Sequence, residues 1–192
     1  MAAHLEGFDI DLMQLEAGAF SGEHMVVGGG PVLLQGGRTS QVLLQRGTSP
    51  PRPTFCFRAL PGRGLTVNGR EIGARAVSVL RPGREFTIRT ETEFPIATIS
   101  VEEAHLRRVA REIGLERTVD SVLRRDQVTG TDSAMHSLRG AWQGLLGVED
   151  SDAADAAHWR KDALETGVIR TLLRTLATET DASKIVAARS LD

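Results

Sequence analysis

The segment that decides the fold is residues 65–73, which read Leu-Thr-Val-Asn-Gly-Arg-Glu-Ile-Gly. Asn68 and Gly69 lie between two short apolar runs. Asn-Gly in this position is the strongest short signal for a two-residue β-hairpin, because both central residues must adopt positive φ. The sequence therefore predicts two antiparallel strands joined by a tight turn at Asn68-Gly69.

Short apolar runs continue on both sides of this hairpin through residues 1–101. Phe8, Ile10 and Leu12 alternate with Asp9 and Asp11, which is the period-2 pattern of a half-buried strand. The remaining predicted strands centre on residues 25–27, 32–34, 42–44, 55–57, 65–67, 77–79, 86–88 and 96–98. Turns are predicted between them at residues 28–31, 36–37, 50–51, 61–62 and 82–83, where glycine and proline gather. About nine short strands with regular turn signals predict an antiparallel sandwich or barrel.

The pattern changes from strand to helix after Val101. Ser100 and Glu103 have the spacing of a capping box, and Gly114 follows the apolar helical positions as a C′ residue would. Further helices are predicted at residues 118–126, around residues 135–145, and from Ser151 or Asp152 through residue 176. We therefore predict an α+β chain, with an N-terminal antiparallel β-barrel or sandwich at residues 1–101 and a bundle of about four helices at residues 102–192.

Composition excludes several classes of protein. The 192 residues are 41% hydrophobic and 25% charged, with a formal net charge of -2. These values are typical of a globular chain and do not suit an electrostatic nucleic-acid binder. The single cysteine, Cys56, excludes an internal disulfide, a cysteine-based zinc finger and an iron–sulfur cluster. Without an apolar stretch of about 18 residues or a signal-peptide pattern, the chain is expected to be cytoplasmic, with no membrane partner.

A β-barrel of this size suggests a cupin-like jelly roll, so metal ligands are the first chemistry to consider. Residues 76–86 look like the second cupin motif: Gly83 matches its glycine, Arg81 stands where its first proline would be, and Phe86 stands where its metal-binding histidine would be. None of the five histidines lies two residues from another, as paired ligands on one strand would. They are His4, His24, His105, His136 and His158. We therefore expect no metal and no cofactor.

Nucleophilic catalysis is not indicated either. The sequence has no Gly-x-Ser-x-Gly elbow, and the glycines at residues 28–30 lack the Gly-Lys-Ser/Thr end of a phosphate loop. Cys56 lies between Phe55 and Phe57, where a small buried hydrophobic side chain is expected. Glu102 and Glu103 begin a helix, where carboxylates interact favourably with the dipole. The chain is therefore predicted not to be an enzyme.

Two interpretations are open for the apolar side chains of the predicted barrel. They form either a simple core or a pocket for a small organic molecule, apolar with a few polar anchors. In the second case Arg38, Arg58 or Arg81 could pair with an anionic group. The candidate ligand-binding residues are Phe55, Phe57, Val77, Val79, Arg81, Phe86 and Ile88.

The order of several motifs resembles the N-terminal half of AraC/XylS-type bacterial transcription regulators between Phe8 and Leu115. The most specific part is the Asn-Gly-Arg-Glu-Ile-Gly hairpin, followed a few residues later by the Leu-Arg-Pro-Gly turn. The sequence departs from the family pattern at residues 73–76, where Gly-Ala-Arg-Ala replaces the usual Gly-x-Gly-Asp. The motifs that carry the resemblance lie at residues 7–15, 34–40, 65–73, 80–83 and 99–101.

This resemblance implies a cupin-like barrel that senses a small molecule or mediates dimerisation, followed by linker helices. In that family a C-terminal domain with two helix-turn-helix motifs binds DNA. The sequence stops at Asp192 and shows no second helix-turn-helix pattern in residues 102–192. We therefore expect a regulatory domain that controls a DNA-binding domain absent from this chain. The alternatives are a cupin-like enzyme, such as an isomerase or a metal-dependent oxygenase, and a stand-alone small-molecule-binding protein.

A broad apolar stripe in the last predicted helix, called the C-terminal stripe below, is the candidate dimer interface. Its spacing is that of one helix face. In a homodimer it would form a two-fold, self-complementary contact. In a monomer the chain would have to cover it with its own barrel. The stripe consists of Leu164, Val168, Leu172, Leu173 and Leu176.

Overall fold

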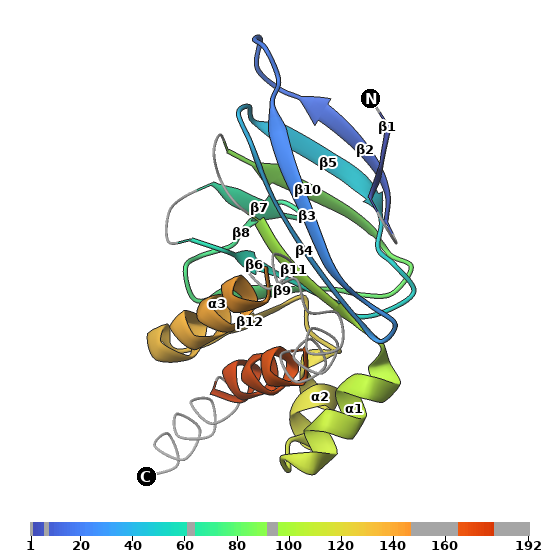
Figure 1. The fold of residues 1–192 in the computed structure, drawn as a ribbon, viewed down its shortest axis with the longest axis vertical. Helices are drawn as coiled ribbons and strands as arrows, with labels where there is room; N and C mark the ends of the chain where they lie inside the picture. The colour runs from blue at the N-terminus through green and yellow to red at the C-terminus, as the bar shows by residue number, and fades with distance from the viewer. Residues whose placement is uncertain (1, 6–7, 61–63, 92–95, 147–164, 179–192) are drawn as a thin grey trace, which may run out of the picture.

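The computed structural model describes residues 2–5, 8–60, 64–91, 96–146 and 165–178. The fold is α+β, with two antiparallel six-stranded sheets and four described helices gathered on one side of them (Figure 1). In order across the sheet, sheet A contains β1 (Ala2–Leu5), β2 (Phe8–Gln14), β5 (Leu43–Thr48), β10 (Glu85–Thr90), β7 (Leu65–Val67) and β8 (Arg70–Glu71). Sheet B contains β12 (Gln127–Thr129), β9 (Ala76–Leu80), β6 (Thr54–Arg58), β11 (Ile96–Val101), β4 (Val32–Thr39) and β3 (Gly22–Gly29).

The strands from β4 to β11 pair in a nested order around one central turn. β4 pairs with β11, β5 with β10, β6 with β9 and β7 with β8, all antiparallel. The turn between β7 and β8 holds Asn68 and Gly69 at φ of 49° and 76°. The predicted hairpin is therefore confirmed, and the residues that flank it meet partners progressively farther away in the sequence. The described strands form two separate sheets and not one closed barrel.

Two hydrophobic clusters divide the molecule into three layers. One cluster lies between the sheets and contains Ile10 and Phe86 from sheet A and Cys56 from sheet B. The other lies between sheet B and the helices and contains Phe55 and Phe57 of β6. Strand alternation sends neighbouring side chains of β6 to opposite faces, so every residue of this strand is buried.

The helices follow the predicted order, although several local predictions were wrong. The four are α1 (Glu103–Glu112), α2 (Glu116–Val122), α3 (Asp132–Leu146) and a helix at residues 165–178. Gly114 has φ of 71° directly after the C-cap of α1, as predicted. Ser100 does not cap α1: its hydroxyl lies 2.8 Å from the Thr54 hydroxyl, across β11 and β6. Residues 127–129 form β12, which joins sheet B although it comes from the predicted helical region.

The predicted turn at Gly36-Gly37 was also wrong, because both glycines lie inside β4. A Cβ atom on Gly36 would lie 2.5 Å from the Trp142 ring of α3. Glycine at position 36 is thus required by a close side-chain approach and not by a turn. The separate prediction of a turn at residues 28–31 is confirmed, because Gly30-Pro31 joins the paired residues Gly29 and Val32.

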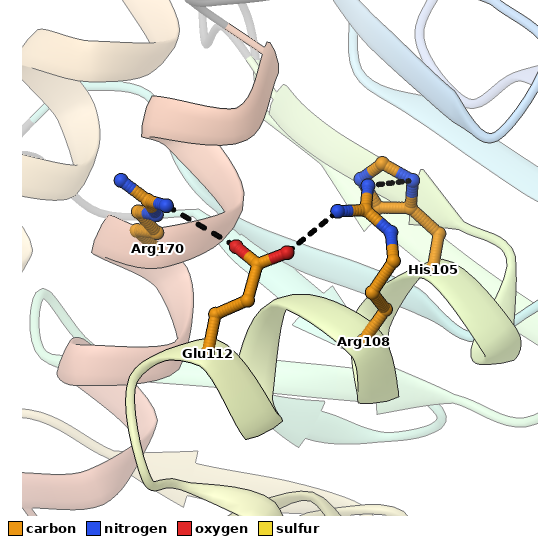
Figure 2. A network of polar contacts seen from close by, with 4 residues as sticks. All are labelled: His105, Arg108, Glu112 and Arg170. Atoms are coloured by element: carbon orange, nitrogen blue, oxygen red, sulfur yellow. Dashed lines mark hydrogen bonds and ion pairs between the residues drawn. The ribbon is translucent and has the colours of Figure 1, made fainter.

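Polar contacts tie the helices to the sheet and to one another. From α3, Arg139 donates hydrogen bonds to the backbone carbonyls of Arg58 and Ala74. Glu112 of α1 accepts hydrogen bonds from Arg108, at 2.7 Å, and from Arg170 of the last described helix, at 3.2 Å (Figure 2). The hydrogen bond from Arg170, followed by the one from Arg108, lowers the pKa of the Glu112 carboxyl group. None of the described helices has the length and apolarity needed to cross a bilayer.

We expect Glu112→Gln to lower the melting temperature slightly at neutral pH and not at acidic pH. A carboxyl group whose folded-state pKa is lowered stabilises the fold above its unfolded pKa, and this contribution is lost as the pH falls through the folded pKa. Melting curves of the two proteins across this range measure the effect. Glu85→Gln on β10 is the control, because Glu85 is exposed and forms no ion pair among the described residues. A difference between wild type and Glu112→Gln that persists in acid would contradict the ionic origin.

Candidate functional site

A cavity of about 250 Å³ lies between the two sheets. Strands β2, β5 and β10 of sheet A supply one wall, and β3, β4, β9 and β11 of sheet B supply the other. Its lining is mainly apolar and includes Ile10, Leu12, Phe20, Leu43, Leu80, Phe86, Ile88 and Ile96. The polar lining residues are Glu23, His24, Gln35, Thr39, Gln45, Thr90 and Thr98.

The strand register explains why these residues meet. Leu12 is opposite Gln45 in the β2–β5 pair, and Gln45 is opposite Ile88 in the β5–β10 pair. Thr90 and Leu43 form the next row on the same face. Because side chains directly opposite each other point to the same face of a sheet, these two rows form a continuous inner surface across three strands.

The hydroxyl group of Thr90 is the most unusual polar group in this lining. Thr90 is only 3% exposed, yet its Oγ1 atom has no hydrogen-bond partner among the described residues. The Thr98 hydroxyl, by contrast, donates to the Gln35 carbonyl at 3.4 Å. Buried polar groups are normally paired, and leaving one unpaired costs about 1–3 kcal/mol. The cavity therefore contains an anchor that is available to a bound molecule.

The ionisable groups of the described lining, Glu23 and His24, are both exposed to solvent. They mark the mouth of the cavity together with Phe20, which is 41% exposed. Although His24 reaches solvent, neighbouring atoms desolvate part of its imidazole and lower its pKa, so the ring is neutral at physiological pH. No described side chain in the lining carries a positive charge at that pH.

The structure brings only two of the seven predicted ligand-binding residues to this cavity. Phe86 and Ile88 line it. The placement of the other five is corrected. Four of them lie on the opposite face of sheet B, in the cluster shared with the helices, because their strands are buried on both sides; they are Phe55, Phe57, Val77 and Val79.

Arg81, the fifth, lies outside the cavity on the protein surface. Its Nη2 atom donates to the Asp126 carboxylate and to the Arg124 carbonyl, both at 3.0 Å. Arg58 is buried, but it donates to the Ile72 carbonyl at 3.4 Å and does not line the cavity; burial lowers its pKa, against the attraction of Glu71 and Glu91. The side chain of Arg38 lies outside the described part of the structure.

Cys56 occupies the buried position that the sequence predicts. It is 0% exposed and belongs to the cluster between the sheets. Burial raises the pKa of its thiol to about 12, so the thiolate needed for nucleophilic attack is scarcely formed at neutral pH. Among the described residues, no three His, Cys, Asp or Glu side chains converge as a metal site would require.

Sequence reasoning missed most of the cavity lining. Leu12 and Leu43 were assigned to strands, but their strands had no predicted partners. Thr90 and Gln45 carry no motif. The signal that could have found them is the register outward from the Asn68-Gly69 turn, since β10 pairs with β7 and then with β5. Once the pairing of β10 with β5 and β7 is known, strand alternation puts Thr90 on the same face as Phe86 and Ile88.

The predicted dimer interface on the C-terminal stripe is corrected as well. Leu164 lies outside the described residues. The other four members are at most 1% exposed and pack in the cluster between sheet B and the helices: Val168, Leu172, Leu173 and Leu176. The chain covers this stripe itself, which was the alternative to an intermolecular contact.

No protein-family model matches the chain, and no curated protein is significantly similar to it.

Proposed function

We propose that the chain is the effector-binding regulatory domain of a cytoplasmic bacterial transcription regulator of the AraC type, which controls a DNA-binding domain outside these residues. The observation that carries the proposal is the apolar cavity between the sheets, with its unpaired Thr90 hydroxyl. The nested strand pairing supports it, because the proposal implies a jelly roll, as in the cupin-like sensor domains of that family, and nested antiparallel pairs in two sheets are what a jelly roll requires.

A sensor must also transmit the state of its cavity, and β4 is placed to do so. Gln35 and Gly36 of β4 line the cavity. On the other face of the same strand, the Trp142 ring of α3 packs against Gly36. A ligand that shifts β4 would therefore act on α3 directly. Coupling free energies between two sites are typically about 1–3 kcal/mol.

The alternative function, a stand-alone binding protein, also requires a ligand in the cavity, but it does not regulate a DNA-binding domain. A reporter assay distinguishes the regulatory domain from the stand-alone binding protein. The chain is fused to a DNA-binding domain that is inactive on its own, and the binding site of that domain is placed upstream of a reporter gene. A regulatory domain makes reporter expression depend on molecules that bind the cavity. Reporter expression that never changes, although the cavity binds its ligand, would contradict the regulatory domain and favour the stand-alone binding protein over it.

We expect Thr98→Phe to weaken binding of the uncharged fluorescent probe N-phenylnaphthylamine by about tenfold or more. Thr98 is 7% exposed and lines the cavity, so a phenyl ring there occupies the space of the probe. Overfilling a packed site costs about 1–3 kcal/mol, and each 1.4 kcal/mol is tenfold in affinity. Fluorescence titration gives the dissociation constants.

Thr87→Phe is the matched control for this experiment. Thr87 lies on β10 between Phe86 and Ile88, so its side chain is on the outer face of sheet A and does not line the cavity. The same substitution there should leave probe binding unchanged. Thermal melts must show that both variants fold. Equal probe binding by wild type and a folded Thr98→Phe protein would place the probe elsewhere and remove the support for an effector cavity.

A further inference from the structure

The lining of the cavity also indicates which kind of molecule it takes, an inference that rests on the proposed function. We infer that the ligand is a small uncharged molecule, mainly apolar, with one oxygen that accepts a hydrogen bond from the Thr90 hydroxyl. The inference rests on three features of the described lining: its apolar walls, its lack of positive charge and the one unpaired buried hydroxyl.

The charge of the ligand follows from the ionisable groups. A carboxylate or phosphate taken out of water needs a cationic partner, or it keeps a large desolvation penalty. The ionisable side chains of the described lining are Glu23 and His24. The neutral imidazole of His24 offers an anion no full positive charge. Anionic ligands are therefore disfavoured at the mouth as well as inside.

The polar group of the ligand follows from Thr90. A hydroxyl group can donate one hydrogen bond and accept others, and at Thr90 none of these is used within the described structure. The residues beside it on the inner face, Leu43 and Ile88, are apolar and cannot satisfy it. A ketone-type oxygen reaching this position would pair the hydroxyl, while the rest of the ligand contacts hydrocarbon. A polyhydroxylated sugar would leave most of its own polar groups unpaired there.

Three cyclohexane derivatives of nearly equal size test the inference. They are cyclohexyl methyl ketone, cyclohexanecarboxylate and isopropylcyclohexane, and their affinities come from displacement of N-phenylnaphthylamine. We expect the carboxylate to bind wild type at least about tenfold more weakly than the ketone. Thr90→Val removes the hydroxyl and keeps the shape. It should weaken the ketone about threefold to tenfold, the value of one hydrogen bond, and leave the hydrocarbon unchanged or tighter.

The outcomes separate this inference from the proposed function. If wild type does not bind N-phenylnaphthylamine, or if none of the three compounds displaces it, both fail together. If the probe binds but the carboxylate displaces it as well as the ketone does, the cavity remains a binding site and the neutral-ligand inference is overturned. An unchanged ketone affinity in a folded Thr90→Val protein overturns the role of the Thr90 hydroxyl.

Discussion

Leu172→Asp is expected to unfold the chain and not to dissociate a folded dimer. Leu172 is 0% exposed and lies in the core between sheet B and the helices. Truncating a buried leucine to alanine already costs about 2–5 kcal/mol, and an unpaired carboxylate in an apolar core adds several more. The total of about 5 kcal/mol or more equals the whole stability of many domains. Circular dichroism and light scattering on the same samples measure folding and mass.

Arg174→Asp provides the control on the same helix. Arg174 is exposed, so introducing the same carboxylate there should leave both the melting temperature and the mass nearly unchanged. A folded Leu172→Asp protein whose mass is half that of wild type would contradict the burial of the C-terminal stripe and restore it as a dimer interface.

The C-terminal stripe, predicted as a dimer interface and found buried within the chain, shows what a helical pattern can and cannot establish. The spacing of Val168, Leu172 and Leu176 correctly indicated a helix with one buried face. Periodicity reports that a face avoids water, but the covering partner depends on tertiary contacts far along the chain. Here those contacts come from sheet B and α3, including the Thr175 hydroxyl, which donates to the Ala134 carbonyl at 3.2 Å.

The incorrect prediction of the cavity residues on β6 and β9 has a related cause. Residues 55–57 and 77–79 are buried on both faces, so neither strand contains a polar side that could tell the inner face of the sandwich from the outer one. Strand alternation places Phe55 and Phe57 on one face of β6, and Val77 and Val79 on one face of β9, but it does not say which face lies between the sheets. The helical layer took those four side chains, and Cys56 and Leu80 turned inward instead.

Glycine was the other source of error. The sequence contains 20 glycines, and most of the turn predictions depended on them. At Gly69 and Gly114 the positive φ confirms this reasoning. At Gly36 the glycine serves a side chain more than 100 positions away, since Trp142 occupies the space where a Cβ atom would be. No local signal distinguishes these two uses, because the second depends on a residue from another layer.

The contact between Gly36 and Trp142 joins the cavity wall to the helical layer. Trp142 is 3% exposed, and its ring meets that of Phe57 edge to face with centroids 6.3 Å apart. Its Nε1 atom is buried without a hydrogen-bond partner among the described residues. The indole is therefore held by shape and apolar contact alone, which makes the space over Gly36 decisive for its position.

We expect Trp142→Ala to destabilise the fold by about 3–5 kcal/mol, the usual cost of deleting a buried aromatic side chain. Gly36→Ala should cost about 1–3 kcal/mol, because its methyl group would have to displace the indole. The double variant should be more stable than the sum of the two losses, since removing the indole makes room for the methyl group. Denaturant unfolding of the four proteins gives the coupling energy.

Gly140→Ala on α3 is the matched control, because a Cβ atom at that position meets nothing within 4 Å. This exposed helical substitution should stabilise the chain by up to about 1 kcal/mol and should add independently to Trp142→Ala. Losses from Gly36→Ala and Trp142→Ala that add to within about 0.5 kcal/mol would show that the two residues do not compete for one space. In that case β4 could not pass a change in the cavity to α3 through this contact. A clear coupling energy would make the Gly36–Trp142 contact the first place to look for a ligand-driven shift.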